Sequence, residues 1–215
     1  MKPIQSMVAI LALALVMSAC AKKMSEEEEA LVGAFEFVVD QYGAMAGQQR
    51  GEATAALIAP QTFERYGEFR EAALHMPQDT LQQQTMFFQL TVLSLRATLT
   101  AEELEGTDGR GLFILAIDRG MVASSLPAVE VVDVDLQGTE AMATFKIDGY
   151  VNEDPVRFVR FEDAWRLDMT SMEPLIERAL VALADQQNIT IEQLREVALA
   201  AVEVRPGVDI WAPLR

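Results

Sequence analysis

The 215-residue chain has a single cysteine, Cys20, and a single histidine, His75. One thiol cannot form a disulfide within the chain, so a packed core must supply stability. One histidine argues against a zinc site built from several His or Cys ligands, and against a serine hydrolase with a histidine base. Basic residues are also scarce, 17 against 33 acidic ones, for a formal charge of −16. Phosphates would repel such a body, so nucleic acid is not expected as a partner.

The N-terminal segment is rich in the features of an export signal. Lys2 supplies a basic start, Met7–Met17 is an uninterrupted apolar run, and the small residues after it lead to Ala19 and Cys20. The apolar run falls within the roughly 7–15 residues of a signal peptide and below the roughly 20 of a membrane-spanning helix. The sequence Met-Ser-Ala-Cys, ending at Cys20, resembles the lipobox of bacterial lipoproteins.

That resemblance implies cleavage between Ala19 and Cys20 and attachment of acyl chains, such as palmitate, to the Cys20 sulfur. The protein would then bind the membrane through its N-terminal acyl chains. Ala21, where an aspartate would favour retention in the inner membrane, points to the outer membrane, facing the periplasm. Two alternatives stay open, namely a soluble secreted protein with a cysteine at the junction and an uncleaved anchor.

The rest of the chain predicts an α+β fold, with N-terminal helices packed on a four-stranded antiparallel meander and followed by C-terminal helices. We expect a signal peptide over 1–19, a lipidated tether over 20–24, an α+β domain over 25–170 and a helical C-terminal extension over 171–215. Within the domain, helices are expected over 25–120 and strands over 129–170. The short tether would keep the folded body close to the bilayer.

Helices are indicated by apolar residues at spacings of three and four and by capping boxes. The boxes pair Ser25 with Glu28, Thr100 with Glu103, and Thr190 with Gln193. Helices are expected over 26–48, 52–59, 62–75, 171–185 and 190–201, and one apolar stripe from Leu81 to Leu99 predicts a single helix of about five turns. The apolar run 112–117 is compatible with either a helix or a buried strand.

After Pro127 the apolar period changes from 3.6 to 2, which predicts strands over 129–136, 141–147, 156–161 and 165–169, with a loop over 149–154. The segment from Arg160 to Asp168 (RFEDAWRLD) resembles the final hairpin of the nuclear-transport-factor-two-like (SnoaL-like) superfamily. The resemblance implies a curved sheet closed over helices. That superfamily includes enzymes, binders and assembly modules, so the resemblance selects no activity.

Few residues suggest chemistry. His75 is expected as a capping or surface histidine at a helix end, with a catalytic base as the alternative. The resemblance implies that Asp148 and Asp168 would line a concave sheet, where enzymes of that superfamily place their acid–base residues. Three arginines are expected to pair with carboxylates on neighbouring strands, or else to form an anionic-ligand site: Arg157, Arg160 and Arg166.

These observations leave three functions open. The first is a non-catalytic interaction or scaffolding module at the membrane, with an unidentified protein partner. The second is a binder of a small apolar or lipidic ligand in a pocket between sheet and helices, and the third is a carboxylate-dependent enzyme. No metal or cofactor motif is recognised, and the first function is the one the sequence favours.

Overall fold

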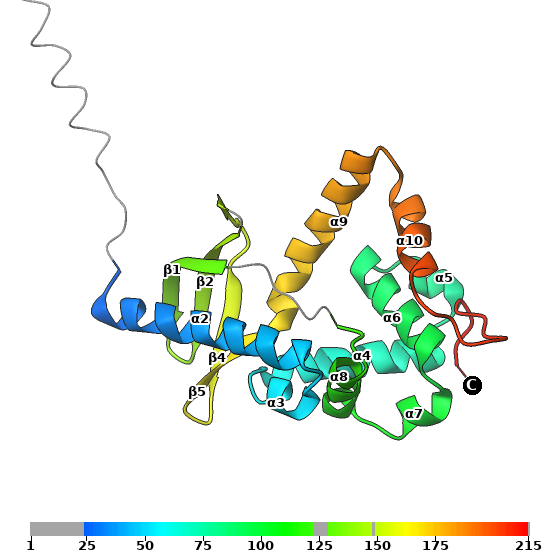
Figure 1. Cartoon of the computed structure of the whole chain (residues 1–215), viewed down its shortest axis with the longest axis horizontal. Coiled ribbons are helices and arrows are strands. Elements are labelled where there is room, and N and C mark those ends of the chain that lie inside the picture. The colour runs from blue at the N-terminus through cyan, green and yellow to red at the C-terminus, as the bar shows by residue number, and fades with distance from the viewer. Residues whose placement is uncertain (1–23, 123–128, 148, 215) are drawn as a thin grey trace, which may run out of the picture.

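The computed structural model describes residues 24–122, 129–147 and 149–214, and Figure 1 shows their arrangement. The predicted sites Ala19 and Cys20 lie outside these residues, as do Asp148 and all of the predicted tether except Met24. Helices come first, then an antiparallel sheet, then helices again, which confirms the predicted α+β class. Among the described residues, no helix is both long and apolar enough to cross a bilayer.

The sheet has the strand order β1-β2-β4-β5, with every neighbouring pair antiparallel. Its strands are β1 (Val129–Gln137), β2 (Glu140–Ile147), β3 (Tyr150–Val151), β4 (Val156–Phe161) and β5 (Ala164–Asp168). The short β3 pairs with β2 inside the segment expected as a loop. A register shift between Val131 and Asp133 interrupts β1, so the predicted strict alternation of this strand is wrong there.

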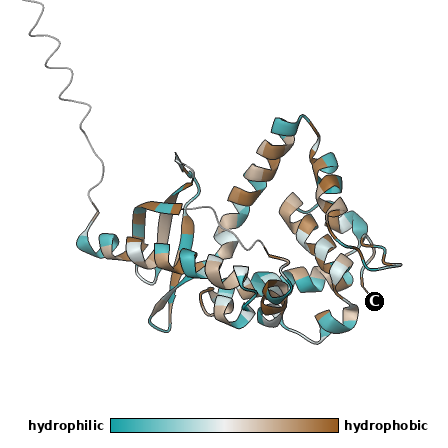
Figure 2. Ribbon diagram, viewed as in Figure 1, coloured by the Kyte–Doolittle hydropathy of each residue, from teal (hydrophilic) through white to brown (hydrophobic). Residues whose placement is uncertain are grey.

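Helix α2 (Glu26–Gly47) lies across the sheet and buries its apolar face against it (Figure 1). The predicted capping box is confirmed, since Ser25 Oγ accepts from the Glu28 amide while Glu28 accepts from the Ser25 amide. The acidic first turn stands out as hydrophilic in Figure 2 and suits the positive end of the helix dipole. Phe35 stacks on Phe158 of β4, with ring centroids 4.0 Å apart.

A short extended stretch joins the helices to the sheet edge. After α3 (Gly51–Ala55), the Ala59 amide donates to the Leu167 carbonyl and the Leu167 amide donates to the Leu57 carbonyl, both at 2.9 Å. These bonds cover part of the outer edge of β5. The helix predicted over 52–59 therefore ends early, because 57–59 is drawn into the sheet.

Helix α4 (Pro60–His75) begins at Pro60, where a proline has no amide to lose. It packs against α8 (Gly109–Asp118). Because α8 includes residues 112–117, this apolar run is a helix and not a strand. The contact is close because residue 109 is glycine. A Cβ there would lie 2.0 Å from the Phe63 carbonyl oxygen.

The helix predicted from Leu81 to Leu99 is two helices, α5 (Gln78–Leu81) and α6 (Met86–Thr98). Thr85, which the stripe placed inside one helix, is instead the N-cap of α6 and accepts from the Phe88 amide. The buried Gln89 side chain donates to the carbonyls of Gln82 and Gln84 in the break. Side-chain partners therefore satisfy the backbone groups that the break leaves open.

After α6, the predicted capping box of Thr100 with Glu103 starts α7 (Ala101–Glu105). The hydrogen bond from Arg119, together with that from the Thr100 amide, lowers the pKa of Glu103 to about 2. The bond from Arg119 therefore connects the end of α8 to the first turn of α7.

The C-terminal segment folds back onto the helices. A 3-10 turn, η1 (Met169–Met172), leads from β5 into α9 (Glu173–Gln187), which projects outward as one arm of a helical hairpin (Figure 1). Helix α10 (Ile191–Ala200) returns against α6 and begins with the third predicted capping box, Thr190 with Gln193. The tail then runs along α4 and α6, where the Leu214 amide donates to the Ala73 carbonyl.

The tail is held by Arg96 of α6, which is fully buried. Its guanidinium donates to carbonyls at the end of α4, at 2.5–3.0 Å: Ala72, Ala73 and Met76. It also reaches the carbonyls of Ile210 and Trp211 in the tail. The guanidinium thus meets the negative end of the α4 dipole and joins two distant segments.

Candidate functional site

A cavity of about 470 Å³ lies among the helices, where α4, α6, η1 and the base of α9 meet. Tyr42 of α2, Ala116 of α8 and residues 121–122 complete its lining. The pocket considered from the sequence was between sheet and helices. The cavity instead draws its lining from helices, η1 and the segment after α8, with no lining residue from the described strands.

Aromatic side chains form one wall of the cavity and hold one another in place. The Tyr66 ring meets Phe69 edge-on at 5.7 Å and Phe113 at 5.1 Å between centroids. Phe69 in turn packs edge-on against Phe87 at 6.0 Å. Such edge-to-face pairs favour fixed ring positions. The wall is therefore built before any ligand arrives.

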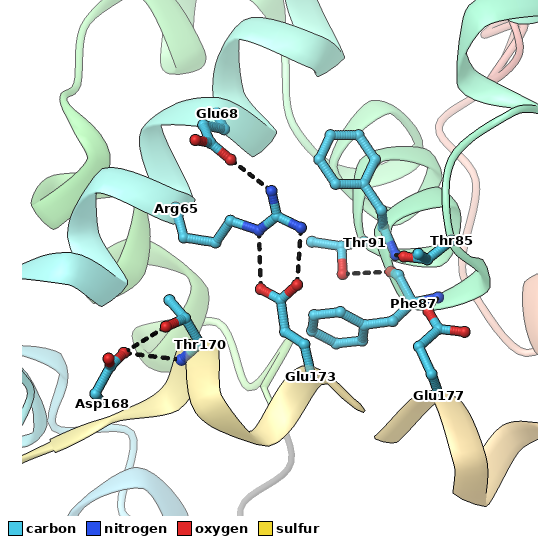
Figure 3. A network of polar contacts seen from close by, with 10 residues as sticks. Arg65, Glu68, Thr85, Phe87, Thr91, Asp168, Thr170, Glu173 and Glu177 are labelled. Carbon is cyan, nitrogen blue, oxygen red and sulfur yellow. Dashed lines mark hydrogen bonds and ion pairs between the residues drawn. The ribbon is translucent and has the colours of Figure 1, made fainter. Parts of the chain in front are cut away.

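One ion pair interrupts the apolar lining. Arg65 of α4 binds Glu173, the first residue of α9, through two parallel hydrogen bonds of 2.8 and 2.7 Å (Figure 3). Its third nitrogen, Nη1, donates to Glu68 at 2.5 Å. Burial lowers the pKa of Arg65, but the hydrogen bonds to Glu173 and Glu68 outweigh it and raise the pKa overall. Arg65 is therefore a cation whose three guanidinium nitrogens each donate to a carboxylate.

Three hydroxyls of the lining have no hydrogen-bond partner within the described residues, namely those of Tyr42, Tyr66 and Ser94. Tyr42 and Tyr66 both face the cavity, and neither hydroxyl has a hydrogen-bond partner within residues 24–122, 129–147 and 149–214. Burial raises the pKa of Tyr42 to about 12. Burial also raises the pKa of Tyr66, with further contributions from Tyr42 and Glu173. Both phenols stay neutral donors at physiological pH.

Helix α9 is attached to the body at separate points along its first half. Glu173 binds Arg65 at its base, and Glu177 one turn later accepts from the Phe87 amide of α6 at 2.6 Å (Figure 3). Arg178 pairs with Asp154, which precedes β4. The half-buried side chains of Ile176 and Leu180 are part of the apolar lining of the cavity. The helix thus forms one side of the cavity.

Asp168, a candidate acid–base residue, is fully buried at the end of β5 and fully engaged. One carboxylate oxygen accepts from Arg157 Nε at 2.7 Å, and the other accepts from the amide and hydroxyl of Thr170 and from Thr62. A carboxylate with these partners anchors η1 to the sheet. Asp168 is not among the residues that line the cavity.

The other residues noted from the sequence lie away from the cavity. His75 is exposed at the last position of α4, 3.7 Å from Glu71, as expected of a surface histidine at a helix end. The predicted pairing of arginines with carboxylates is confirmed for Arg157 across β4 and β5. At the turn of the same hairpin, Arg160 of β4 pairs with Asp163, and Arg166 of β5 pairs with Glu162. Within the described residues, no three His, Cys, Asp or Glu side chains are grouped as metal ligands.

Sequence reasoning missed the residues that define the cavity, above all Arg65, Glu173, Tyr42 and Tyr66. One local signal was present, since Arg65 is a charged residue adjacent to Tyr66 and one helical turn before Phe69. The pairing of Arg65 with Glu173 spans 108 positions, so no local pattern indicates it.

Comparison with known protein families, with characterised proteins and with solved structures finds no match for this chain. The resemblances to bacterial lipoproteins and to the nuclear-transport-factor-two-like superfamily therefore remain predictions from the sequence.

Proposed function

We propose that this protein is a lipid-anchored envelope protein that binds a small apolar molecule in the cavity between α4, α6 and α9. The cavity is the observation that carries this proposal. Its volume lies within the roughly 300–1,000 Å³ of ligand sites, and apolar walls with a few polar groups are typical of them. The non-catalytic interaction module favoured by the sequence stays a prediction. The cavity leads us to place ligand binding first.

The polar groups around the cavity support binding more than catalysis. Asp168 is held by Arg157 and two threonines, and Glu173 is held by Arg65. General acid–base work needs a carboxyl group within hydrogen-bond reach of a substrate and free to exchange a proton. Both carboxylates instead fasten elements together around the cavity.

Filling the cavity tests the proposal. N-phenylnaphthylamine, a neutral dye that fluoresces in apolar surroundings, should bind the purified folded protein saturably. Ser94→Trp should reduce the bound fraction at least tenfold, because Ser94 lines the cavity and an indole would occupy it. Glu64→Trp is the matched control, since Glu64 is exposed on α4 outside the lining.

Thermal unfolding of both variants checks that each remains folded. Dye that fails to bind, or that binds equally well to Ser94→Trp, would contradict the proposal, because either result removes the cavity as the site.

The anchor is tested separately in the bacterial host or an equivalent export system. The unaltered chain should sediment with membranes, with an intact mass that includes acyl groups on Cys20. Cys20→Ser should appear in the soluble fraction, because the acyl chains would be lost and stable anchoring takes more than one chain. Met17→Leu, which restores the usual lipobox residue, is the control that should stay membrane-bound. Membrane association of Cys20→Ser at the unaltered level would refute the anchor.

A further inference from the structure

The charge of the cavity is already balanced without a ligand. Arg65 is the basic member of the lining, and every nitrogen of its guanidinium donates to a carboxylate of Glu173 or Glu68. An incoming anion would find three of the five guanidinium N–H groups already engaged, and it would meet the Glu173 carboxylate at close range. Like charges at short distance in a poorly solvated site repel strongly, and burying an unpaired charge is costly.

The two phenol hydroxyls have the opposite character. Tyr42 is almost fully buried, with 1% of its surface exposed, and Tyr66 is fixed by its contacts with Phe69 and Phe113. Neither hydroxyl has a hydrogen-bond partner among the described residues, and neither oxygen is one of the fully buried polar atoms that lack a partner. Each can donate one hydrogen bond and accept others. They are suited to an uncharged oxygen on a ligand.

We infer that the cavity selects an apolar ligand whose polar end is an uncharged oxygen group, such as an alcohol, ester or ketone, received by Tyr42 and Tyr66. The same geometry rejects the carboxylate of a free fatty acid. This inference rests on the proposed ligand-binding function and names the chemical class of its ligand. The selectivity comes from the closed Arg65–Glu173 pair, which acts against anions, and from the phenols, which act for neutral acceptors.

A matched pair of ligands tests the selectivity. Decanol and decanoate have the same chain length, and decanoate is ionised at neutral pH. Decanol should displace N-phenylnaphthylamine at a concentration at least about tenfold lower than decanoate does. A tenfold difference in affinity is about 1.4 kcal/mol. Direct titration by calorimetry confirms that displacement reports binding at the same site.

Two variants with matched controls identify the groups responsible. Tyr66→Phe should reduce the preference for decanol severalfold, because it removes one donor, whereas Tyr150→Phe should not, because Tyr150 is 81% exposed on β3. Glu173→Gln should improve decanoate binding severalfold, because it removes the carboxylate and releases Arg65. Glu71→Gln, at an exposed position paired with Arg70, should leave it unchanged.

The outcomes separate the two proposals. If the dye binds and decanoate displaces it as well as decanol does, the selectivity is wrong while ligand binding stands. The same holds if neither compound displaces bound dye. If the dye itself does not bind, the proposed function fails and the selectivity fails with it. Loss of folding in Glu173→Gln, detected by circular dichroism, leaves the ligand pair and Tyr66→Phe as the deciding measurements.

Discussion

Replacing Arg96 with methionine is expected to lower the free energy of unfolding by about 3–5 kcal/mol, because several buried carbonyls lose their donor at about 1–3 kcal/mol each. The substitution keeps the apolar stem but leaves the carbonyls of Ala72, Ala73 and Met76 without their donor. It also frees the tail at Ile210 and Trp211. Urea unfolding followed by circular dichroism measures the loss.

Two further substitutions make the Arg96 result specific. Arg96→Lys should recover only part of the stability, because an ammonium cannot present the planar fork that reaches several carbonyls at once. Arg110→Met should cost less than about 1 kcal/mol, because the Arg110–Glu52 pair is exposed. A loss for Arg96→Met as small as that for Arg110→Met would show that the guanidinium does not hold the tail.

Phe158→Ala is expected to cost about 3–5 kcal/mol, the range for deleting a buried phenylalanine from a core. Phe158 has no exposed surface and stacks on Phe35, which in turn meets Trp165 edge-on at 5.4 Å. The substitution opens a void between α2 and the sheet. Denaturant unfolding gives the value.

Phe161→Ala, on the same strand, is the matched control. Phe161 is 39% exposed and contacts Arg166 at 4.7 Å, so its removal should cost about 1 kcal/mol or less. Equal losses at the two positions would mean that the stacked pair is not a centre of the core.

Sequence patterns predicted best those features that depend on neighbouring residues. All three capping boxes were predicted from spacing alone, because each pairs side chains with amides three positions apart. The antiparallel hairpins of the sheet also follow from short-range alternation and turns. The α+β class was accessible because the change of period after Pro127 separates helices from strands.

Errors occurred where distant residues decide the local structure. The break between α5 and α6 depends on Thr85 and Gln89 nearby, but also on Glu177 of α9, which accepts from the Phe87 amide. An apolar stripe continues across the break, so periodicity alone predicts one helix over both segments. The early end of α3 likewise depends on the pairing of Leu57 and Ala59 with Leu167.

The cavity was the least accessible feature. It needs side chains from α2, α4, α6, α8, η1 and α9 to converge, and the apolar ones look like ordinary core residues of their own helices. Glu173 resembles a carboxylate placed for the helix dipole, which it also is. Only the folded arrangement shows that it closes onto Arg65.

The Arg96 contacts have a consequence for the order in which the protein matures. Arg96 lies 114 positions before Ile210 and 115 before Trp211, whose carbonyls it requires. A chain that is synthesised from its N-terminus contains this cation well before those acceptors are added. The hydrogen bonds of Arg96 to the tail can therefore form only after the final residues of the chain have been made.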